Sequence, residues 1–158
     1  MNIKSYNKGA VIFRQGDPGD CMYDIQFGKV GIFDHYGEPD EKKIADLYVD
    51  QLFGEMGLLD HAPRSATAVA LEKDTVVSVV SEEEFYEYFE KEPVKVLVLM
   101  QQMCNRLRRT SKDYLEACRT VHDAVAAEKT GEKKCGGLLA SLQKLCAAYK
   151  GFDYYTRN

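Results

Sequence analysis

The stretch of sequence that decides the fold is FGEMGLLDHAPR, residues 53–64, which continues directly into Ser65-Ala66-Thr67. It places two glycines and the carboxylate of Glu55 at the predicted start of a short helix, and Arg64 follows nine residues after Glu55. A helix N-terminus offers unpaired backbone N–H groups and a partial positive charge, which favour an anion. Arg64 adds a permanent cation with forked donors, and Glu55 is an acceptor for a sugar hydroxyl. The stretch therefore predicts a site for a sugar phosphate.

Around this stretch, up to about residue 80, the sequence shows short strand patterns and glycine turns. Apolar and polar residues alternate over 23–27 and again over 30–32, on either side of Gly28-Lys29, which predicts a hairpin or a sharply bent strand pair. Two further strands are predicted over 65–71 and 75–80. We expect a small antiparallel β structure, a β-roll or jelly-roll-like barrel, within an α+β fold.

The pattern changes at Ser81, which is followed by three glutamates and therefore predicts a helix N-cap with an acidic first turn. A short helix to about Glu90 is expected, and Pro93 permits a second, long helix over about 94–128. Apolar and small residues recur along the long helix at alternating spacings of four and three, at Met100, Cys104, Leu107, Ser111, Tyr114, Cys118, Val121 and Val125. Such a seven-residue repeat predicts a homodimer through this helix. The alternative is an amphipathic helix that lies on its own roll.

Residues 1–128 are thus expected to form one domain with flanking helices and a long C-terminal helix, and 129–158 a short helical extension. Composition fits this reading, because a chain of 158 residues that is 45% hydrophobic and 29% charged is an ordinary globular protein. We expect no membrane contact and a cytoplasmic location, since the apolar stretch 94–100 is too short to span a bilayer and no leader pattern precedes it. Five cysteines without a C-x-x-C pair indicate reduced thiols.

Charge is distributed unevenly along the chain. Residues 1–103 hold 10 Lys and Arg against 19 Asp and Glu, whereas residues 104–158 hold 11 against 6. A basic C-terminal part can meet nucleic acid or an acidic partner, or can simply form a solvated helix face, and we favour the second reading. The three histidines lie far apart in the sequence and no nucleophile or P-loop motif occurs, so we expect neither a metal site nor an enzyme.

Several motifs in order resemble the cyclic-nucleotide-binding family over roughly residues 5–128. They are the turn GDPGD at 16–20, the strand pattern MYDIQFGKV at 22–30, and the cassette at 53–64 with its Ser-Ala-Thr. The resemblance implies a β-roll flanked by helices, in which ligand binding at the cassette repositions the C-terminal helix. It implies a cyclic nucleotide as the ligand and no other cofactor.

Residue by residue, the resemblance implies that Glu55 binds the ribose 2′-hydroxyl and that Arg64 pairs with the cyclic phosphate. Gly54, Met56 and Ser65 complete the ligand-binding set at the cassette. This agrees with the chemistry of the residues, because a phosphate taken out of water requires charge-assisted hydrogen bonds. Ser65 does not choose the base, since different branches of the family use a hydroxyl there for guanine or for phosphate.

The stretch MCNRLRRTS at 103–111 resembles the part of the long helix in catabolite-activator-like members where a threonine and a serine reach the adenine, the serine from the neighbouring subunit. The resemblance therefore adds Thr110 and Ser111 to the ligand-binding residues and favours cyclic AMP, with cyclic GMP as the alternative. Ser111 lies on the seven-residue repeat, which agrees with a role across a dimer. The bland alternative is that both hydroxyls are ordinary surface residues.

Three other interpretations stay open. In the first, Glu55 and Arg64 pair with each other across a loop and bind no ligand. The chain can be a catabolite-activator-type transcriptional regulator whose DNA-binding part is truncated or atypical, although 129–158 supplies no evident helix-turn-helix and DNA is not favoured as a partner. It can also be an interaction module that has the fold without the ligand.

Overall fold

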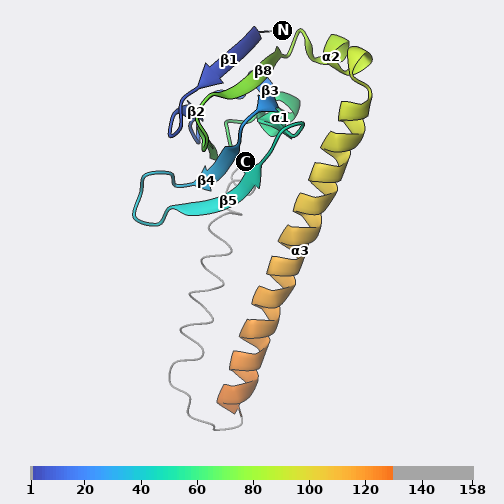
Figure 1. Cartoon of the computed structure of the whole chain (residues 1–158). Coiled ribbons are helices and arrows are strands. Elements are labelled where there is room, and N and C mark those ends of the chain that lie inside the picture. Colours follow the sequence, from blue (N-terminus) through green and yellow to red (C-terminus); the bar gives the residue numbers. More distant parts are fainter. Residues whose placement is uncertain (1, 130–158) are drawn as a thin grey trace. The chain divides into compact units, whose positions relative to one another are not determined.

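The computed structural model describes residues 2–129, with side chains described to residue 123 (Figure 1). The chain divides into two compact units, Met1–Met100 and Gln101–Asn158. The predicted helical extension lies outside the described residues apart from Lys129.

In the first unit, the described strands form two four-stranded antiparallel sheets. One sheet has the order β1 (Asn2–Tyr6), β8 (Thr75–Ser81), β3 (Cys21–Phe27) and β6 (Leu52–Phe53). The other has the order β2 (Val11–Phe13), β7 (Thr67–Ala70), β4 (Val30–Asp34) and β5 (Lys42–Leu47). The predicted antiparallel β-roll is confirmed, and its sheets do not close into a barrel.

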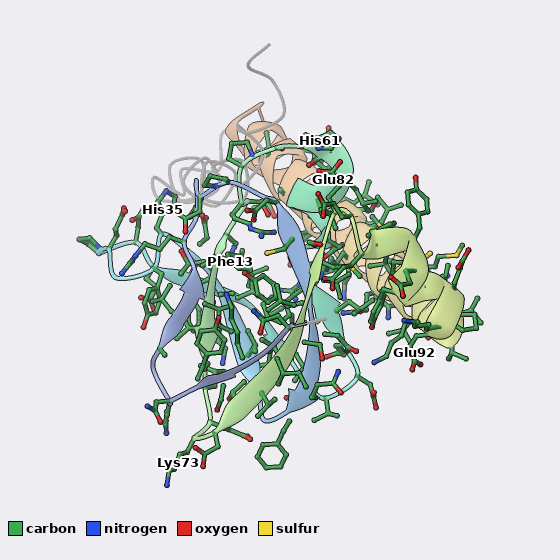
Figure 2. The ribbon with its side chains drawn as sticks, turned by 90° about the horizontal axis from the view of Figure 1, so that it is seen from above. Phe13, His35, His61, Lys73, Glu82 and Glu92 are labelled. Carbon is green, nitrogen blue, oxygen red and sulfur yellow. The ribbon has the colours of Figure 1, made fainter. Side chains whose placement is uncertain are left out.

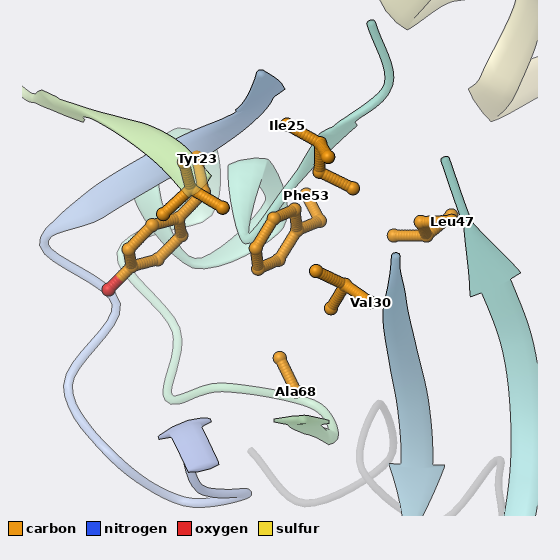
Figure 3. Close-up of a cluster of buried hydrophobic side chains, with 7 residues drawn as sticks. Tyr23, Ile25, Val30, Leu47, Phe53 and Ala68 are labelled. Atoms are coloured by element: carbon orange, nitrogen blue, oxygen red, sulfur yellow. The ribbon is translucent and has the colours of Figure 1, made fainter. Parts of the chain in front are cut away.

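The hydrophobic core lies between the two sheets, and its position follows from the alternation of side chains along each strand. Tyr23 and Ile25 on β3 point into it, and their neighbour Met22 faces the other side of the sheet. The core contains residues from both sheets: Tyr23, Ile25, Val30, Leu47, Phe53, Ala68 and Val77 (Figure 3). Burial of these apolar side chains is what holds the sheets together.

Of the two arrangements expected across Gly28-Lys29, the hairpin does not form, because β3 and β4 belong to different sheets, and the sharp bend between the two strands is the one observed. Gly28 has a φ of 84°, and a Cβ there would lie 2.7 Å from Oγ1 of Thr75. The tight glycine turn carries the chain from one sheet to the other, so Ile25 and Val30 meet in the same core. Alternation alone could not separate these arrangements, since the same residues are buried in both.

Three helices are described: α1 (Glu55–Asp60), α2 (Phe85–Lys91) and α3 (Val94–Lys129). The short helix at the cassette and the long helix after Pro93 are therefore confirmed. The expected N-cap is wrong, because Ser81 is the last residue of β8 and Glu84 caps α2. Ser81 and Glu84 instead exchange hydrogen bonds, Glu84 N to Ser81 Oγ and Ser81 N to Glu84 Oε2, both 3.3 Å. This exchange holds the turn between strand and helix.

The outer face of the β1–β8–β3–β6 sheet is covered by helices of the same unit. A second buried cluster joins this face to α1, α2 and the first turns of α3, and it consists of Met22, Leu52, Leu58, Val80, Tyr88 and Leu99. Strand β3 therefore separates two environments, the core on one face and the helix layer on the other. Both environments carry buried polar side chains, described below.

In the second unit, the described residues are those of α3, and their side chains are mostly exposed. Leu107 and Tyr114, which belong to the predicted seven-residue repeat, are 68% and 53% exposed. None of the helices described up to residue 129 is long and apolar enough to cross a membrane.

Candidate functional site at the start of α1

The site is built where β6 ends and α1 begins. Gly54 is the N-cap of α1 and has a φ of 75°, a left-handed conformation that glycine adopts without a steric penalty. A Cβ at this position would lie 2.9 Å from Nη1 of Arg64 and 3.2 Å from the ring of Tyr23. The glycine is therefore required twice, once for the turn and once for the approach of the arginine.

A second close approach fixes the loop that precedes β3 against α1. A Cβ on Gly19 would lie 2.6 Å from the Cα of Gly57 and 2.7 Å from the carbonyl oxygen of Ala62. Those neighbours are backbone atoms, which cannot swing aside as a flexible side chain can. The two glycines thus let the turn around residues 16–20 pack backbone to backbone on α1.

The backbone of Arg64 is tied to the same turn. Its N–H donates to the carbonyl oxygen of Asp17 at 2.8 Å, and its own carbonyl accepts from the N–H of Gly16 at 2.9 Å. The arginine therefore stands at a position fixed by two elements, the turn at 16–20 and the end of the cassette.

The guanidinium of Arg64 is almost completely buried, with 3% of the residue exposed. Its Nη1 donates to the carbonyl oxygen of Gly54 at 2.6 Å, and its Nη2 lies 3.4 Å from Sγ of Cys21 and 3.8 Å from a carboxylate oxygen of Asp20. Its Nε has no hydrogen-bond partner in the described part of the chain. A buried cation with an unused donor is costly, because its hydration is lost and not fully replaced.

Aromatic rings pack against the guanidinium of Arg64. The guanidinium carbon lies 4.5 Å from the ring centroid of Phe13 and 5.7 Å from that of Tyr23. The ring of Tyr23 is in turn stacked on Phe53, with centroids 5.0 Å apart. Burial and the nearby Cys21 raise the pKa of Tyr23, and Arg64 only partly opposes this shift. The hydroxyl of Tyr23 therefore stays protonated at neutral pH. Rings of this kind stabilise a cation without neutralising its charge.

The cassette residues predicted from the sequence come together here. Glu55 is the first residue of α1 and is 1% exposed, Met56 is partly buried, and Ser65 is exposed directly after Arg64. Because α1 has only six residues, its dipole is small, and the positive potential of the site comes mainly from Arg64. His61, which ends α1 in a left-handed conformation, is exposed.

Thr110 and Ser111 are the two predicted residues outside this group. Both lie on α3 in the second unit and both are exposed. Their part in ligand binding stays a prediction.

The sequence did not predict the residues that hold Arg64 in place, which are Phe13, Cys21 and the pair Gly19 and Gly57. A signal was present, because Phe13 and Cys21 flank the glycine-rich turn at 16–20. What the sequence did not reveal is that this turn folds back on α1. Within residues 2–129 no group of His, Cys, Asp and Glu is suited to holding a metal ion, and the described cysteines, Cys21, Cys104 and Cys118, are free thiols.

Known proteins are similar to this chain in sequence and in fold. The profile of the family described as "Cyclic nucleotide-binding domain" matches residues 3–92. The chain is 38% identical over 103 residues to the cyclic AMP receptor protein of Thermus thermophilus, which covers 65% of this chain and 47% of that protein. It is 36% identical over 70 residues to a cAMP-dependent protein kinase regulatory subunit of Blastocladiella emersonii, covering 44% and 17% respectively.

Among solved structures, the catabolite activator protein of Thermus thermophilus aligns with a TM-score of 0.61 and 28% identity, over 96% of this chain and 76% of that one. The chain spans about half the length of the Thermus receptor protein and less than a fifth of the Blastocladiella subunit. With a family profile that matches more than half of its residues and relatives that share its fold, the chain belongs to the cyclic nucleotide-binding domain family.

Proposed function

We propose that the chain is a sensor for cyclic AMP, with residues 1–128 as the sensing domain and 129–158 as an extension. The single observation that carries the proposal is the buried guanidinium of Arg64, whose Nε has no partner within residues 2–129 and which lies beside the start of α1. A phosphate oxygen supplies the acceptor that this cation lacks. The similarity to a cyclic AMP receptor protein and to a cAMP-dependent protein kinase regulatory subunit supports the same ligand and a regulatory, non-catalytic role.

In the proposed complex, Arg64 pairs with the cyclic phosphate and Glu55 accepts a hydrogen bond from the ribose 2′-hydroxyl. The backbone at Gly54, Met56 and Ser65 completes the anion site. The rings beneath Arg64 hold the cation in place before the ligand arrives, so little ordering of the site is needed on binding.

The second part of the proposal concerns α3. Thr110 and Ser111 contact the base, Ser111 from a second copy of the chain, and α3 pairs with its counterpart along the repeat that includes Leu107 and Tyr114. The exposure of both apolar side chains supports this pairing. The ligand thereby biases the arrangement of α3 through its different affinities for two states. Sedimentation with and without cyclic AMP tests the dimer.

Isothermal titration of Arg64→Met with cyclic AMP tests the site. We expect an affinity at least roughly 30-fold lower than that of the unchanged chain, because truncating one partner of a buried charge pair costs about 2–5 kcal/mol. Arg64→Lys should fall between the two, since an ammonium keeps the charge and loses the forked geometry.

Lys73→Met is the matched control for the loss of one positive charge. Lys73 lies at the opposite end of the roll from His61, which ends the cassette helix (Figure 2), and we expect it to leave the affinity unchanged. An Arg64→Met variant that binds cyclic AMP as tightly as the control would remove the proposed site. Cyclic GMP in the same titration decides between the two bases, and absence of binding by either ligand would favour an interaction module that has the fold alone.

Transcriptional regulation is a second candidate, favoured by the similarity to the Thermus catabolite activator protein. Such a protein binds duplex DNA through basic side chains, so its affinity falls steeply with salt. A gel shift of the natural full-length protein at several salt concentrations tests this. An affinity that does not change with salt, or no shift at all, would argue against it.

A further inference from the structure

A second buried ionic cluster lies on the other face of β3 from Arg64. Its centre is Asp24, which is 3% exposed and follows directly after Tyr23 in the strand. We name it the Asp24 cluster and define it by Asp24, Asp50, Tyr88 and Lys95. Nothing in the proposed ligand chemistry uses these residues.

Every oxygen of the central carboxylate has a partner. Oδ1 of Asp24 accepts from Nζ of Lys95 at 2.9 Å, and Oδ2 accepts from the hydroxyl of Tyr88 at 2.8 Å and from Nε2 of Gln26 at 2.8 Å. Lys95 also donates to Oδ1 and to the carbonyl oxygen of Asp50, at 3.0 and 3.2 Å. The cluster is a saturated hydrogen-bond network, which makes it rigid.

The ion pair at its centre is shielded from water. The side chains of Lys95 and Asp24 are 12% and 5% exposed. Burial acts to lower the pKa of Lys95, but its hydrogen bonds to Asp24 and Asp50 outweigh that effect and the pKa is raised. Burial and the neighbouring Asp24 raise the pKa of Tyr88, so the phenol stays protonated. Lys95 is consequently a stable cation in this environment.

The cluster connects the strand pair of the binding site to the start of α3. In the pairing of β3 with β6, Tyr23 lies opposite Phe53 and Asp24 lies opposite Leu52. Tyr23 and Phe53 support the cassette, whereas Asp24 and Leu52 face the helix layer. Lys95 is the second residue of α3, so the network binds the first turn of this helix to β3.

We propose that the Asp24 cluster holds residues 94–100 of α3 on β3 in both the ligand-free and the ligand-bound chain, and that cyclic AMP changes α3 only beyond Met100. Lys95 is then a positioning residue that anchors the helix. The part of this inference that concerns the ligand rests on the proposed function. Its physical basis is a comparison of free energies, because breaking a buried ion pair costs more than a ligand usually contributes as coupling between two sites.

The structure supplies two further supports. Leu99 is 8% exposed and belongs to the buried cluster that covers the outer face of the sheet, so the second turn of α3 is held by apolar contacts as well. The compact first unit ends at Met100, directly after this contact. Both observations place the end of the anchored segment at the same point.

Hydrogen exchange of the full chain, read by mass spectrometry over residues 94–100 and 101–123, tests the inference. Isothermal titration is done first, so that cyclic AMP is present at saturation. We expect exchange in 94–100 to change less than about twofold with cyclic AMP, while exchange in 101–123 changes by more. In ligand-free Lys95→Met, exchange in 94–100 should rise roughly tenfold or more, because the anchor is lost.

Two variants complete the design. Lys91→Met removes an exposed pair with Glu87 on α2 and should leave exchange in 94–100 unchanged. Should Lys95→Met fail to fold, Asp50→Asn removes the negative charge of the exposed partner of Lys95 and should raise exchange in 94–100 in the same direction by a smaller factor. Lys95→Arg, which keeps the cation, should restore most of the protection.

The outcomes separate the inference from the proposed function. Absence of cyclic AMP binding in the titration would refute the proposed ligand, and the ligand-free comparison of Lys95→Met with Lys91→Met would still decide whether the cluster anchors α3. With binding established, a change in 94–100 as large as that in 101–123 would overturn the inference. So would a Lys95→Met chain that folds and exchanges like the unchanged chain.

Discussion

Each face of β3 has a buried charge beside it, and the two charges differ in how completely the protein hydrogen-bonds them. On the core side, next to Tyr23, the guanidinium of Arg64 keeps an Nε without a partner in the described residues. On the helix side, Asp24 has a partner for both of its oxygens. The two residues are equally buried, at 3% exposed each. The difference therefore lies in how completely the protein itself bonds each charge.

This difference separates a site from a structural element. A buried charge that is fully bonded contributes rigidity, and removing one partner strands the other. A buried charge that is left partly unbonded lowers the stability of the empty protein and is retained where a ligand supplies the missing bond. By this criterion we assign Arg64 to the proposed ligand site and Asp24 to the scaffold.

The largest expected effect comes from a substitution in the Asp24 cluster. Asp24→Ala leaves Lys95 as a buried cation that has lost its most buried partner, and we expect the free energy of unfolding of the ligand-free chain to fall by about 3–5 kcal/mol. Arg64→Met, under the same conditions, should change it by less than about 1 kcal/mol, because the charge it removes is incompletely bonded. Urea unfolding of both variants measures the contrast.

A double variant supplies the control for this contrast. Lys95→Met in the Asp24→Ala background removes the stranded cation and should recover part of the lost stability. If Arg64→Met destabilised the empty chain as much as Asp24→Ala does, the distinction between an unsaturated site and a saturated scaffold would be wrong.

A smaller effect is expected from a substitution that displaces the turn at 16–20, which binds the backbone of Arg64. Gly57→Ala places a Cβ 2.8 Å from the Cα of Gly19 and 3.0 Å from the carbonyl oxygen of Ala62, so the turn at 16–20 must shift. We expect a loss of about 1–3 kcal/mol in stability, typical of overpacking. Cyclic AMP affinity should fall as well, because this turn binds the backbone of Arg64.

Leu59→Ala is the matched control on the same helix, since Leu59 is 48% exposed and lies outside the glycine contact. Thermal unfolding and titration of both variants measure the two effects. Equal affinities for Gly57→Ala and Leu59→Ala would show that the turn does not position the arginine.

The smallest expected effect is a pH dependence on the scaffold side. The pKa of Lys95 is raised above its usual value of 10.5, so the folded chain holds this proton more tightly than the unfolded chain. Its contribution to stability is fully present below about pH 10.5 and is lost as the pH rises through the folded-state pKa. The raised pKa of Tyr88 acts in the same direction.

Chemical unfolding between about pH 9 and about pH 11 measures this dependence. The decrease in stability should be steeper in the unchanged chain than in Lys95→Met. Lys91→Met, which removes a lysine with a raised pKa on the exposed surface, should follow the unchanged chain because solvent screens that pair. If stability decreased equally with pH in the unchanged chain and in both variants, the Asp24–Lys95 pair would contribute nothing to the loss of stability at high pH.

Local patterns in the sequence predicted most of the fold. The strands at 67–70 and 75–81, the short cassette helix and the start of the long helix after Pro93 all occur as expected. Each of these depends on chemistry within a few residues, such as glycine at a left-handed turn or proline before a helix. The hairpin, one of two arrangements expected at Gly28-Lys29, and the N-cap expected at Ser81 do not occur, and both depended on which strand pairs with which.

The cassette was predictable for the same reason, because Gly54, Glu55, Arg64 and Ser65 lie within one short stretch. The residues that position Arg64 were not. Phe13 and Gly19 reach the cassette only after two sheets have packed face to face, and no sequence spacing between residue 13 and residue 64 encodes that contact.

The sequence by itself determined that this protein carries a β-roll, a short glycine-containing helix at 53–64 and a long helix, since these follow from local periodicity and turn chemistry. Only the tertiary structure decided which buried charges are saturated. Asp24 and Lys95 are 71 residues apart, and Arg64 meets Phe13 and Cys21 across the roll. Whether a charge is bonded depends on what folding brings within hydrogen-bond distance of it, and this is a property of the packed molecule rather than of any stretch of its sequence.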